Sequence, residues 1–422
     1  MKVVHLSTVD LSGAGRAAMR IVKALKAYGV DATLLCLFCR LHDADTVAYC
    51  PPRLPLWFRI GKRMHLWSTA AQMRNRVFAP YNLKDGVNFL HSDCKVEMSS
   101  YVQTADIIHL HWIEQFVDLS LLFKQTRQPI VWTLHDMGAF TAICNYNYLG
   151  CNHYHNRCGK CPVLDSTNEV DLSRDIWQEK AYLFERNMCR LYIVTCSNWL
   201  ANCARNSGLL KNANIRVIPN CIDTNMFRPM GHKRNGNRLS VMLGAYDAMD
   251  PNKGYERLSR IVEEFAKQSD FSLEVVVVGK NSDNISFSSN ISVASYGFVE
   301  RETDLVNIYN KVDLLLYGSY RDNLPNMIME AMACGVPVVA FPVGGIPDMV
   351  KHKKTGYLAE SEADYICGIQ YCVENWQHLH LNARAMVEDC FSTEVVASKY
   401  NALYEEIYGK KSYNNCFDAC KE

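Results

Sequence analysis

The chain has 422 residues, of which 49% are hydrophobic and 21% charged, a length that exceeds one typical domain and suits two domains of roughly 200 residues each. Its formal net charge of +1 gives no overall field that would favour nucleic acid as a partner. No apolar run approaches a membrane-spanning helix and the N-terminus has no signal-peptide pattern, so we expect a cytoplasmic protein whose 18 cysteines are mostly reduced.

Apolar, strand-like runs alternate with helix-period segments along both halves of the chain. The alternation predicts an α/β protein with two doubly wound, Rossmann-like domains, each a parallel sheet with helices on both faces. We place the domains at residues 1–218 and 219–391, with a terminal helical segment at 392–422. The expected strands are 3–7, 32–38, 107–111, 130–135 and 191–196 in the first half, and 239–243, 273–278, 291–296, 314–317 and 336–341 in the second.

A short glycine-containing segment, SGAGRAA at Ser12–Ala18, follows the first strand and precedes an expected helix at Arg16–Tyr28. The match to G-x-G-x-x-A is typical of dinucleotide-binding proteins, so a dinucleotide-dependent oxidoreductase is one candidate function. Two features disfavour it. The gap from the strand to the first glycine is long, and the second strand ends at Phe38–Arg40 without an acid to bind a ribose.

The segment Arg53–Phe78 contains six Lys or Arg, two Trp, two Phe and no acid. Such a basic, aromatic face suits peripheral docking on an anionic membrane surface. The alternative is a helix that covers the core and has a solvated basic face.

Three histidines follow or lie on the expected strands of the first half. His109 and His111 alternate, so they lie on the same face; they could form half a metal site, but we expect core or cleft histidines, with His111 and Trp112 as cleft wall. His135 ends a buried strand, where open α/β sheets bind ligands, and Asp136 is the second candidate there.

Four cysteines with the spacing C-x6-C-x6-C-x2-C form an insertion at residues 144–161. Four thiols within 18 residues indicate a candidate structural zinc site. Unligated thiols and a redox disulfide are the alternatives, and His153 or His155 could replace one thiol. The cysteines are Cys144, Cys151, Cys158 and Cys161.

The segment Ser319–Phe341, SYRDNLPNMIMEAMACGVPVVAF, predicts a loop, a helix and an apolar strand. Asn323 is the expected N-cap, Pro325 suits the first turn, and Gly335 ends the helix. Unpaired N–H groups at such a helix start favour a phosphate.

The acids Asp322 and Glu330 lie eight positions apart in this segment, which resembles the E-x7-E signature of retaining glycosyltransferases of family four, with Asp in place of the first Glu. The resemblance implies the GT-B fold, in which two Rossmann-like domains face a cleft and a C-terminal helix crosses back to the N-terminal domain. It also implies that Asp322 contacts donor-sugar hydroxyls, that Glu330 binds the ribose, and that catalysis requires no metal or other cofactor.

The resemblance assigns further roles. It implies that His135 lies close to the transferred sugar and that Lys253 neutralises the leaving diphosphate. The family's partner arginine has no match upstream of Lys253, so Arg257 or Arg321 is a candidate substitute. The catalytic candidates are thus His135, Asp322 and Lys253, and Gly344 and Gly345 resemble a loop near the donor sugar. The donor-binding candidates are Gly13, Gly15, Lys253, Gly297, Phe298, Val299, Asp322, Asn323, Leu324, Pro325, Asn326 and Glu330.

The function expected from this resemblance is transfer of a sugar from a UDP- or GDP-sugar to a glycan or lipid-linked acceptor. The cysteine-rich insertion is similar to that of bacterial family members that assemble cell-surface polysaccharides, so we expect a role in capsule, exopolysaccharide or lipopolysaccharide synthesis, with contact to the inner face of the membrane. The alternative is a non-catalytic, sugar-binding relative of the family, in which Asp322, with a shorter side chain than the Glu of the signature, no longer supports turnover.

Overall fold

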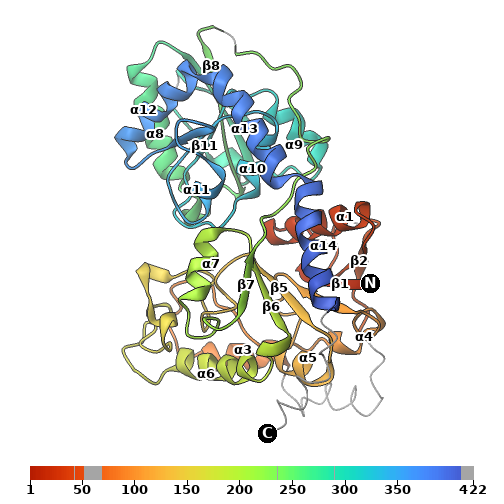
Figure 1. Cartoon of the computed structure of the whole chain (residues 1–422). Coiled ribbons are helices and arrows are strands. Elements are labelled where there is room, and N and C mark those ends of the chain that lie inside the picture. The colour runs from red at the N-terminus through yellow and green to blue at the C-terminus, as the bar shows by residue number, and fades with distance from the viewer. Residues whose placement is uncertain (42, 52–68, 235, 289, 410–422) are drawn as a thin grey trace. The chain divides into compact units, whose positions relative to one another are not determined.

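The computed structural model describes residues 1–41, 43–51, 69–234, 236–288 and 290–409. The contacts divide the chain into two compact units (Figure 1). Among the described residues, the first unit comprises 1–218 and 397–409, and the second comprises Pro219–Val396.

The first unit is built on a seven-stranded sheet with the order β3-β2-β1-β4-β5-β6-β7. All neighbouring strands run parallel, and the order reverses between β1 and β4. Its strands are β1 (Lys2–Val9), β2 (Asp31–Phe38), β3 (Thr46–Ala48), β4 (Ile107–Leu110), β5 (Ile130–Leu134), β6 (Leu191–Thr195) and β7 (Asn214–Val217). Its helices are α1 (Gly13–Ala27), α3 (Ala70–Phe78), α4 (Ser100–Gln103), α5 (Leu119–Gln125), α6 (Leu172–Glu185), α7 (Asn198–Arg205) and, from Ala397 on, α14 (Thr393–Gly409).

The two faces of this sheet differ in chemistry because side chains alternate along a strand. Val4 and Leu6 of β1 join the apolar core, which also contains Phe123 of α5 and Phe184 of α6. His5 lies between them on the opposite face, where β1 pairs His5 with His109 of β4. The central strands therefore carry polar side chains inside the fold.

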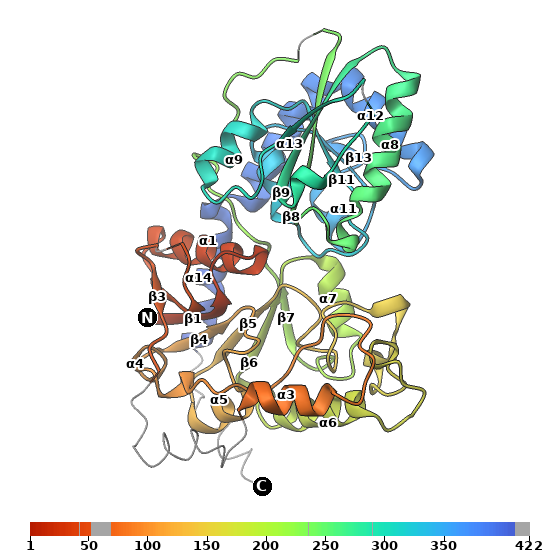
Figure 2. The ribbon, with the colours of Figure 1, turned by 180° about the vertical axis from the view of Figure 1, so that it is seen from behind.

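The second unit has a six-stranded parallel sheet with the order β10-β9-β8-β11-β12-β13. Helices α8 and α12 contact each other, and α10 contacts α9 and α13, so helices cover both faces (Figure 2). The strands are β8 (Arg238–Asp247), β9 (Ser272–Lys280), β10 (Ser292–Ser295), β11 (Leu314–Tyr317), β12 (Val338–Ala340) and β13 (Gly356–Leu358). The helices are α8 (Tyr255–Gln268), α9 (Glu302–Tyr309), α10 (Asn326–Ala333), α11 (Ile346–Met349), α12 (Glu362–Glu374) and α13 (Trp376–Phe391).

The predicted α/β class with two doubly wound domains is confirmed, and all ten predicted strands are present. Two predicted helix starts are wrong. The first helix begins at Gly13 rather than Arg16, because the Ser12 side chain accepts a hydrogen bond from Gly15 and caps it. Asn323 is not the N-cap of α10; Pro325 occupies that position and Asn326 is the first helical residue.

The structure bears on two expectations about membranes: the basic, aromatic segment and the absence of a membrane-spanning helix. Residues 53–68 of the basic, aromatic segment lie outside the described residues, and the described remainder forms α3, capped by Thr69. In the part of the chain that the structure describes, no helix is long and apolar enough to cross a membrane.

Candidate functional site

The candidate donor residues of the second unit lie at the carboxyl-terminal edge of its sheet, where the strand order reverses. Lys253 follows β8 and Asp322 follows β11, and these two strands are neighbours. Open parallel sheets bind ligands at this switch point because the strand-to-helix loops diverge there. The Lys253 ammonium donates to Asp322 Oδ2 at 2.8 Å, so residues 69 positions apart form one ion pair.

Tyr317, the last residue of β11, completes the setting of this ion pair. Its hydroxyl donates to the same Asp322 oxygen at 2.6 Å. Burial, together with the Asp322 carboxylate, raises the pKa of Tyr317 well above its ordinary value, so the hydroxyl stays a donor at neutral pH. Asp322 is thereby held in one position by a cation and a neutral donor.

Helix α10 begins four residues after Asp322 and carries Glu330 in its second turn. Glu330 is 5% exposed, and its Oε2 accepts a hydrogen bond from the Tyr309 hydroxyl at 2.9 Å. A buried carboxylate is retained where hydrogen-bond donors satisfy it. The helix start and the acid are suited to a ligand that combines an anion with hydroxyl groups.

The two arginines considered as substitutes in diphosphate binding have different surroundings. The Arg257 guanidinium lies 3.6 Å from the Phe341 ring centroid and also donates to the Gly318 carbonyl. It thus supports the loop. Arg321 Nε donates to Asn252 Oδ1 at 3.0 Å, and Asn252 directly precedes Lys253 in the sequence. Arg321 is therefore the better placed of the two.

The remaining candidates of the second unit line neighbouring loops at the same edge. Gly297 follows β10 with φ +62°, and its N–H donates to Ser282 Oγ at 3.1 Å. The Phe298 ring packs edge to face against the Tyr246 ring, with 5.2 Å between the ring centroids. Gly344 also has a positive φ, +56°, and lies in the loop after β12. Asn323 and Leu324 are buried between β11 and α10.

The glycine segment of the first unit opens helix α1 directly. A Cβ on Gly15 would lie 2.3 Å from the Val9 carbonyl oxygen, so this glycine allows α1 to pack against the end of β1. The N–H of Gly15 donates to Ser12 Oγ at 3.1 Å. A Cβ on Gly13 would meet nothing within 4 Å, so Gly13 faces open space at the helix start.

His135 belongs to a row of hydrogen-bonded histidines that crosses three strands. His135 Nε2 lies 3.1 Å from His111 Nδ1, and His111 Nε2 lies 3.0 Å from His5 Nδ1. At the other end, His135 Nδ1 lies 3.7 Å from the Cys196 sulfur. Burial lowers the pKa of His135 to about 4 and that of His5 to about 3, so both are neutral at pH 7. If each ring donates its one N–H in the same direction along the row, every one of these contacts joins a donor to an acceptor.

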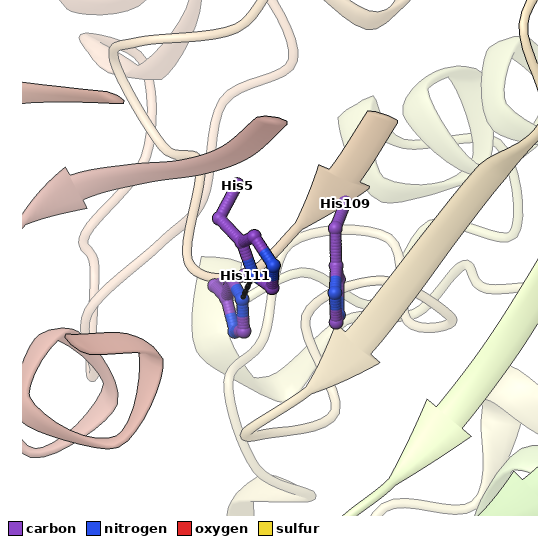
Figure 3. A group of neighbouring side chains, drawn as sticks. All are labelled: His5, His109 and His111. Atoms are coloured by element: carbon purple, nitrogen blue, oxygen red, sulfur yellow. Dashed lines mark hydrogen bonds between the residues drawn. The ribbon is translucent and has the colours of Figure 1, made fainter. Parts of the chain in front are cut away.

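The rings of His5, His109 and His111 lie close enough together that one metal ion could be held between them (Figure 3). Their ligand atoms all lie within 4.8 Å of one another, and they form the one such group among the described residues. Both ring nitrogens of His109 are engaged, however, by Tyr404 at 2.5 Å and Thr133 at 2.7 Å. His111 is engaged on both nitrogens as well, so the group is a neutral network that fixes His135.

We expect His5 to make the unfolding free energy depend on pH. The folded-state pKa, about 3, lies below the ordinary value of 6.5, so the unfolded chain takes up a proton first as the pH falls. The stability that neutral His5 contributes is present above pH 6.5 and decreases below it by up to about 1.4 kcal/mol per pH unit. Urea unfolding at pH 7.5 and 5.5 should show a steeper loss for the wild type than for His5→Gln. The exposed His378→Gln control should behave like the wild type, and equal losses in wild type and His5→Gln would contradict this origin.

A pocket of the first unit lies beside His111 and His135. Its empty volume is about 620 Å³, part of it open to solvent, and Trp112 lines it together with both histidines. Burial raises the pKa of Asp136 to about 6, while Asp136 Oδ1 accepts from the Gly138 N–H at 2.8 Å. His111 and Trp112 therefore line a pocket wall, as predicted.

Sequence reasoning missed two charged residues of this pocket. Burial raises the pKa of Glu114 to about 7 and lowers the pKa of Lys180 to about 8. Lys180 is buried in α6, where its ammonium donates to the carbonyls of Gly138 and Thr141 at 2.7 and 2.9 Å. A lysine facing inward from an amphipathic helix was the available signal for Lys180.

The four insertion cysteines all line a second pocket of the first unit, with an empty volume of about 340 Å³. Cys158 and Cys161 are buried, and the other two are half-buried. All four are free thiols in this structure.

Comparison with known proteins identifies both halves of the chain. The model of the family described as "Glycosyltransferase Family 4" matches residues 11–226, just over half of the chain. The model described as "Glycosyl transferases group 1" matches residues 238–375.

Two of the curated relatives match parts of the chain at 24% and 30% sequence identity. Escherichia coli WcaC, a putative colanic acid biosynthesis glycosyl transferase, is 30% identical over 56% of this chain and 58% of its own length. N-acetyl-alpha-D-glucosaminyl L-malate synthase of Bacillus anthracis is 24% identical over 46% of this chain and 55% of its own. The chain thus spans little more than half the length of these relatives.

Solved structures support the fold over nearly the whole chain. Sucrose-phosphate synthase from Thermosynechococcus elongatus covers 97% of this chain and 100% of its own, with a TM-score of 0.65 and 16% identity. Anabaena HepE in complex with UDP-glucose covers 96% and 100%, with a TM-score of 0.61 and 16% identity. At these identities the likeness concerns the fold, and the predicted GT-B class is confirmed.

Proposed function

Because the chain belongs to glycosyltransferase family 4, we propose that it transfers a sugar from a nucleotide-sugar donor, with retention of anomeric configuration, to a glycan or lipid-linked acceptor. The single observation that carries this proposal is the Lys253–Asp322 ion pair at the switch point of the second sheet. A cation and a fixed carboxylate at that position suit a diphosphate and the hydroxyls of a sugar.

The donor roles follow from the charge that develops in the reaction. Cleavage of the bond between sugar and diphosphate increases negative charge on the leaving group, and a preorganised cation stabilises that charge in the transition state. Lys253 supplies the cation, with Arg321 beside it through Asn252. Asp322, held by Lys253 and Tyr317, orients the hydroxyls of the sugar rather than attacking its anomeric carbon.

The nucleotide is proposed to be UDP, with GDP as the second candidate. The solved structure of Anabaena HepE, which shares the fold, contains UDP-glucose. In this chain, buried Glu330 would accept the ribose hydroxyls, and the loop Gly297–Val299 would contact the base. No catalytic metal is needed in this scheme, because Lys253 and the N-terminus of α10 supply the positive charge.

The acceptor is proposed to bind the first unit, in the pocket beside His135. His135 positions the sugar and acceptor there, and Asp136 offers a carboxyl group for a hydroxyl. The pathway is proposed to be cell-surface polysaccharide synthesis, since WcaC and Staphylococcus aureus CapM, a capsular polysaccharide biosynthesis glycosyltransferase, are relatives of the chain. The enzyme would act in the cytoplasm, at the inner face of the membrane.

The alternative functions predict different ligands. A dinucleotide-dependent oxidoreductase would bind NAD or NADP at Gly13–Ala18, and a non-catalytic relative would bind a nucleotide sugar without turning it over. Thermal unfolding with UDP, GDP, their sugars and NAD, followed by release of the diphosphate, separates these functions. We expect stabilisation and turnover with a UDP-sugar. Micromolar affinity for NAD would overturn the proposal, and binding without turnover would support the non-catalytic alternative.

Glu330→Gln is expected to weaken UDP binding by about 10- to 100-fold, since a hydrogen bond to a charged group contributes about 1.5–3 kcal/mol. Isothermal titration calorimetry with UDP measures this. The control is Tyr309→Phe, which removes the hydroxyl on Glu330 Oε2 and leaves the carboxylate. Affinity unchanged in Glu330→Gln would contradict the ribose assignment.

A further inference from the structure

The cysteine-rich insertion of the first unit contains an arrangement that the transfer reaction does not use. Between β5 and α6 its regular structure consists of three short 3-10 turns, at Tyr148–Gly150, His153–His155 and Pro162–Leu164. Its four cysteines converge on one pocket. Short turns without a sheet or long helix bury little apolar surface, so such a segment commonly gains its stability from a cross-link or a metal ion.

Backbone N–H groups are directed at three of the four sulfurs. The N–H of His153 donates to the Cys151 sulfur, and the N–H groups of Val163 and Leu164 donate to the Cys161 sulfur. The Cys158 sulfur receives the N–H of Ala142. Hydrogen bonds of this kind stabilise a thiolate, and sulfur ligands of structural metals are held by such outer contacts.

The charge around the pocket also suits thiolates. Buried Lys180 of α6 interacts electrostatically with Cys158 and Cys144. Four thiolates around a divalent ion carry a net charge of −2, which is costly inside a protein unless cations or N–H dipoles offset it. Lys180 and the four N–H groups supply that offset.

We propose that Cys144, Cys151, Cys158 and Cys161 bind one structural zinc ion as a tetrahedral site with four thiolate ligands. The ligand type favours zinc, since thiolates are soft ligands that select zinc over calcium or magnesium. Gly159 permits the tight turn between the last two ligands, with φ +138° and its Cα packed so closely that a Cβ would lie 2.3 Å from the Glu169 carbonyl oxygen. His153 Nδ1 lies 2.8 Å from the Gly159 carbonyl oxygen, so this imidazole supports the turn.

The sulfurs do not form a closed set in this structure. No three of the four sulfurs lie within 4.8 Å of one another, an arrangement that among the described residues only the ligand atoms of the three histidines show. Binding therefore draws the insertion together, and loss of the ion should loosen it, because metal binding and local folding are coupled.

The test uses the full-length protein, purified under reducing conditions. Elemental analysis should find about one zinc per chain. Zinc-depleted protein titrated with Co²⁺ should develop thiolate-to-cobalt charge-transfer absorption and the visible bands of tetrahedral cobalt. Cys158→Ser should lose most of the zinc and the cobalt bands, whereas Cys36→Ser, a buried cysteine of β2 in the same unit, should retain both.

A second measurement uses only the wild-type protein, so that it applies even if Cys158→Ser does not fold. Wild-type protein titrated with a mercurial thiol reagent should release one zinc per chain once the four insertion thiols have reacted, whereas reaction of the exposed Cys189 and Cys367 alone should release none. Metal-free wild-type protein that binds neither Zn²⁺ nor Co²⁺ would overturn the proposal. So would peptide mapping that finds a disulfide between Cys144 and Cys161. Either result would leave the glycosyltransferase proposal intact, because that proposal rests on the second unit.

Discussion

Asp322→Asn is expected to lower the turnover of the donor by about 10²- to 10³-fold, the loss typical when one preorganised electrostatic contact is removed from an active site. The variant keeps the shape of the side chain and the Tyr317 hydrogen bond, but removes the charge that fixes the Lys253 ammonium at 2.8 Å. The position of the donor hydroxyls and of the cation should both become less defined. Diphosphate release from the UDP-sugar measures kcat, and calorimetry measures the UDP affinity, which should change little.

The matched control is Glu274→Gln. Glu274 also accepts two hydrogen bonds through one oxygen, from Arg238 at 2.8 Å and Ser240 at 2.9 Å. It lies near the start of β9, at the opposite edge of the same sheet. Turnover should stay close to the wild-type value. If both variants lost activity equally, the effect of Asp322→Asn would be structural, and the assignment of Asp322 to the donor would fail.

Lys253→Met is expected to lower kcat/KM by about 10²- to 10³-fold, because the developing charge of the diphosphate loses its cation. Unlike Asp322→Asn, this variant should also weaken binding of UDP itself, since the diphosphate is already charged in the ground state. Calorimetry with UDP and with uridine separates the two contributions: uridine, which has no phosphate, should bind both proteins alike.

Lys267→Met serves as the control for Lys253→Met. Lys267 belongs to α8, the helix that follows Lys253, and pairs on its surface with Glu264 at 3.3 Å. An exposed pair of this kind contributes little, so both binding and turnover should persist. UDP affinity that is unaffected by Lys253→Met would show that the cation lies away from the diphosphate.

The fold could be predicted from the sequence because its central strands are continuous apolar runs, which parallel buried strands require. The three strands that were missed, β3, β7 and β13, have three or four residues each and lie at or near the sheet edges. The start of helix α1 was misplaced because two glycines argue against a helix by propensity, whereas the Ser12 cap and the contact of Gly15 with β1 favour it.

The site could be predicted only where a local pattern marks it. Asp322 and Glu330 are eight residues apart, so one segment reveals both. Their partners are distant in sequence: Lys253 meets Asp322 only because β8 and β11 are neighbours. His5 is a similar case, since it reaches His111 through the register of β1 and β4. Contacts of this kind depend on sheet order, which no local window contains.

Retention is tested most directly by the anomeric configuration of the free sugar that is released first when water takes the place of the acceptor and the enzyme hydrolyses an α-linked UDP-sugar. Proton NMR of the reaction, recorded before mutarotation is complete, distinguishes the two anomers, and Asp322→Asn provides the inactive comparison. We expect UDP release with the α-anomer of the sugar appearing first. A β-anomer formed first would contradict retention, and the absence of turnover across UDP- and GDP-sugars would contradict the proposed transfer itself.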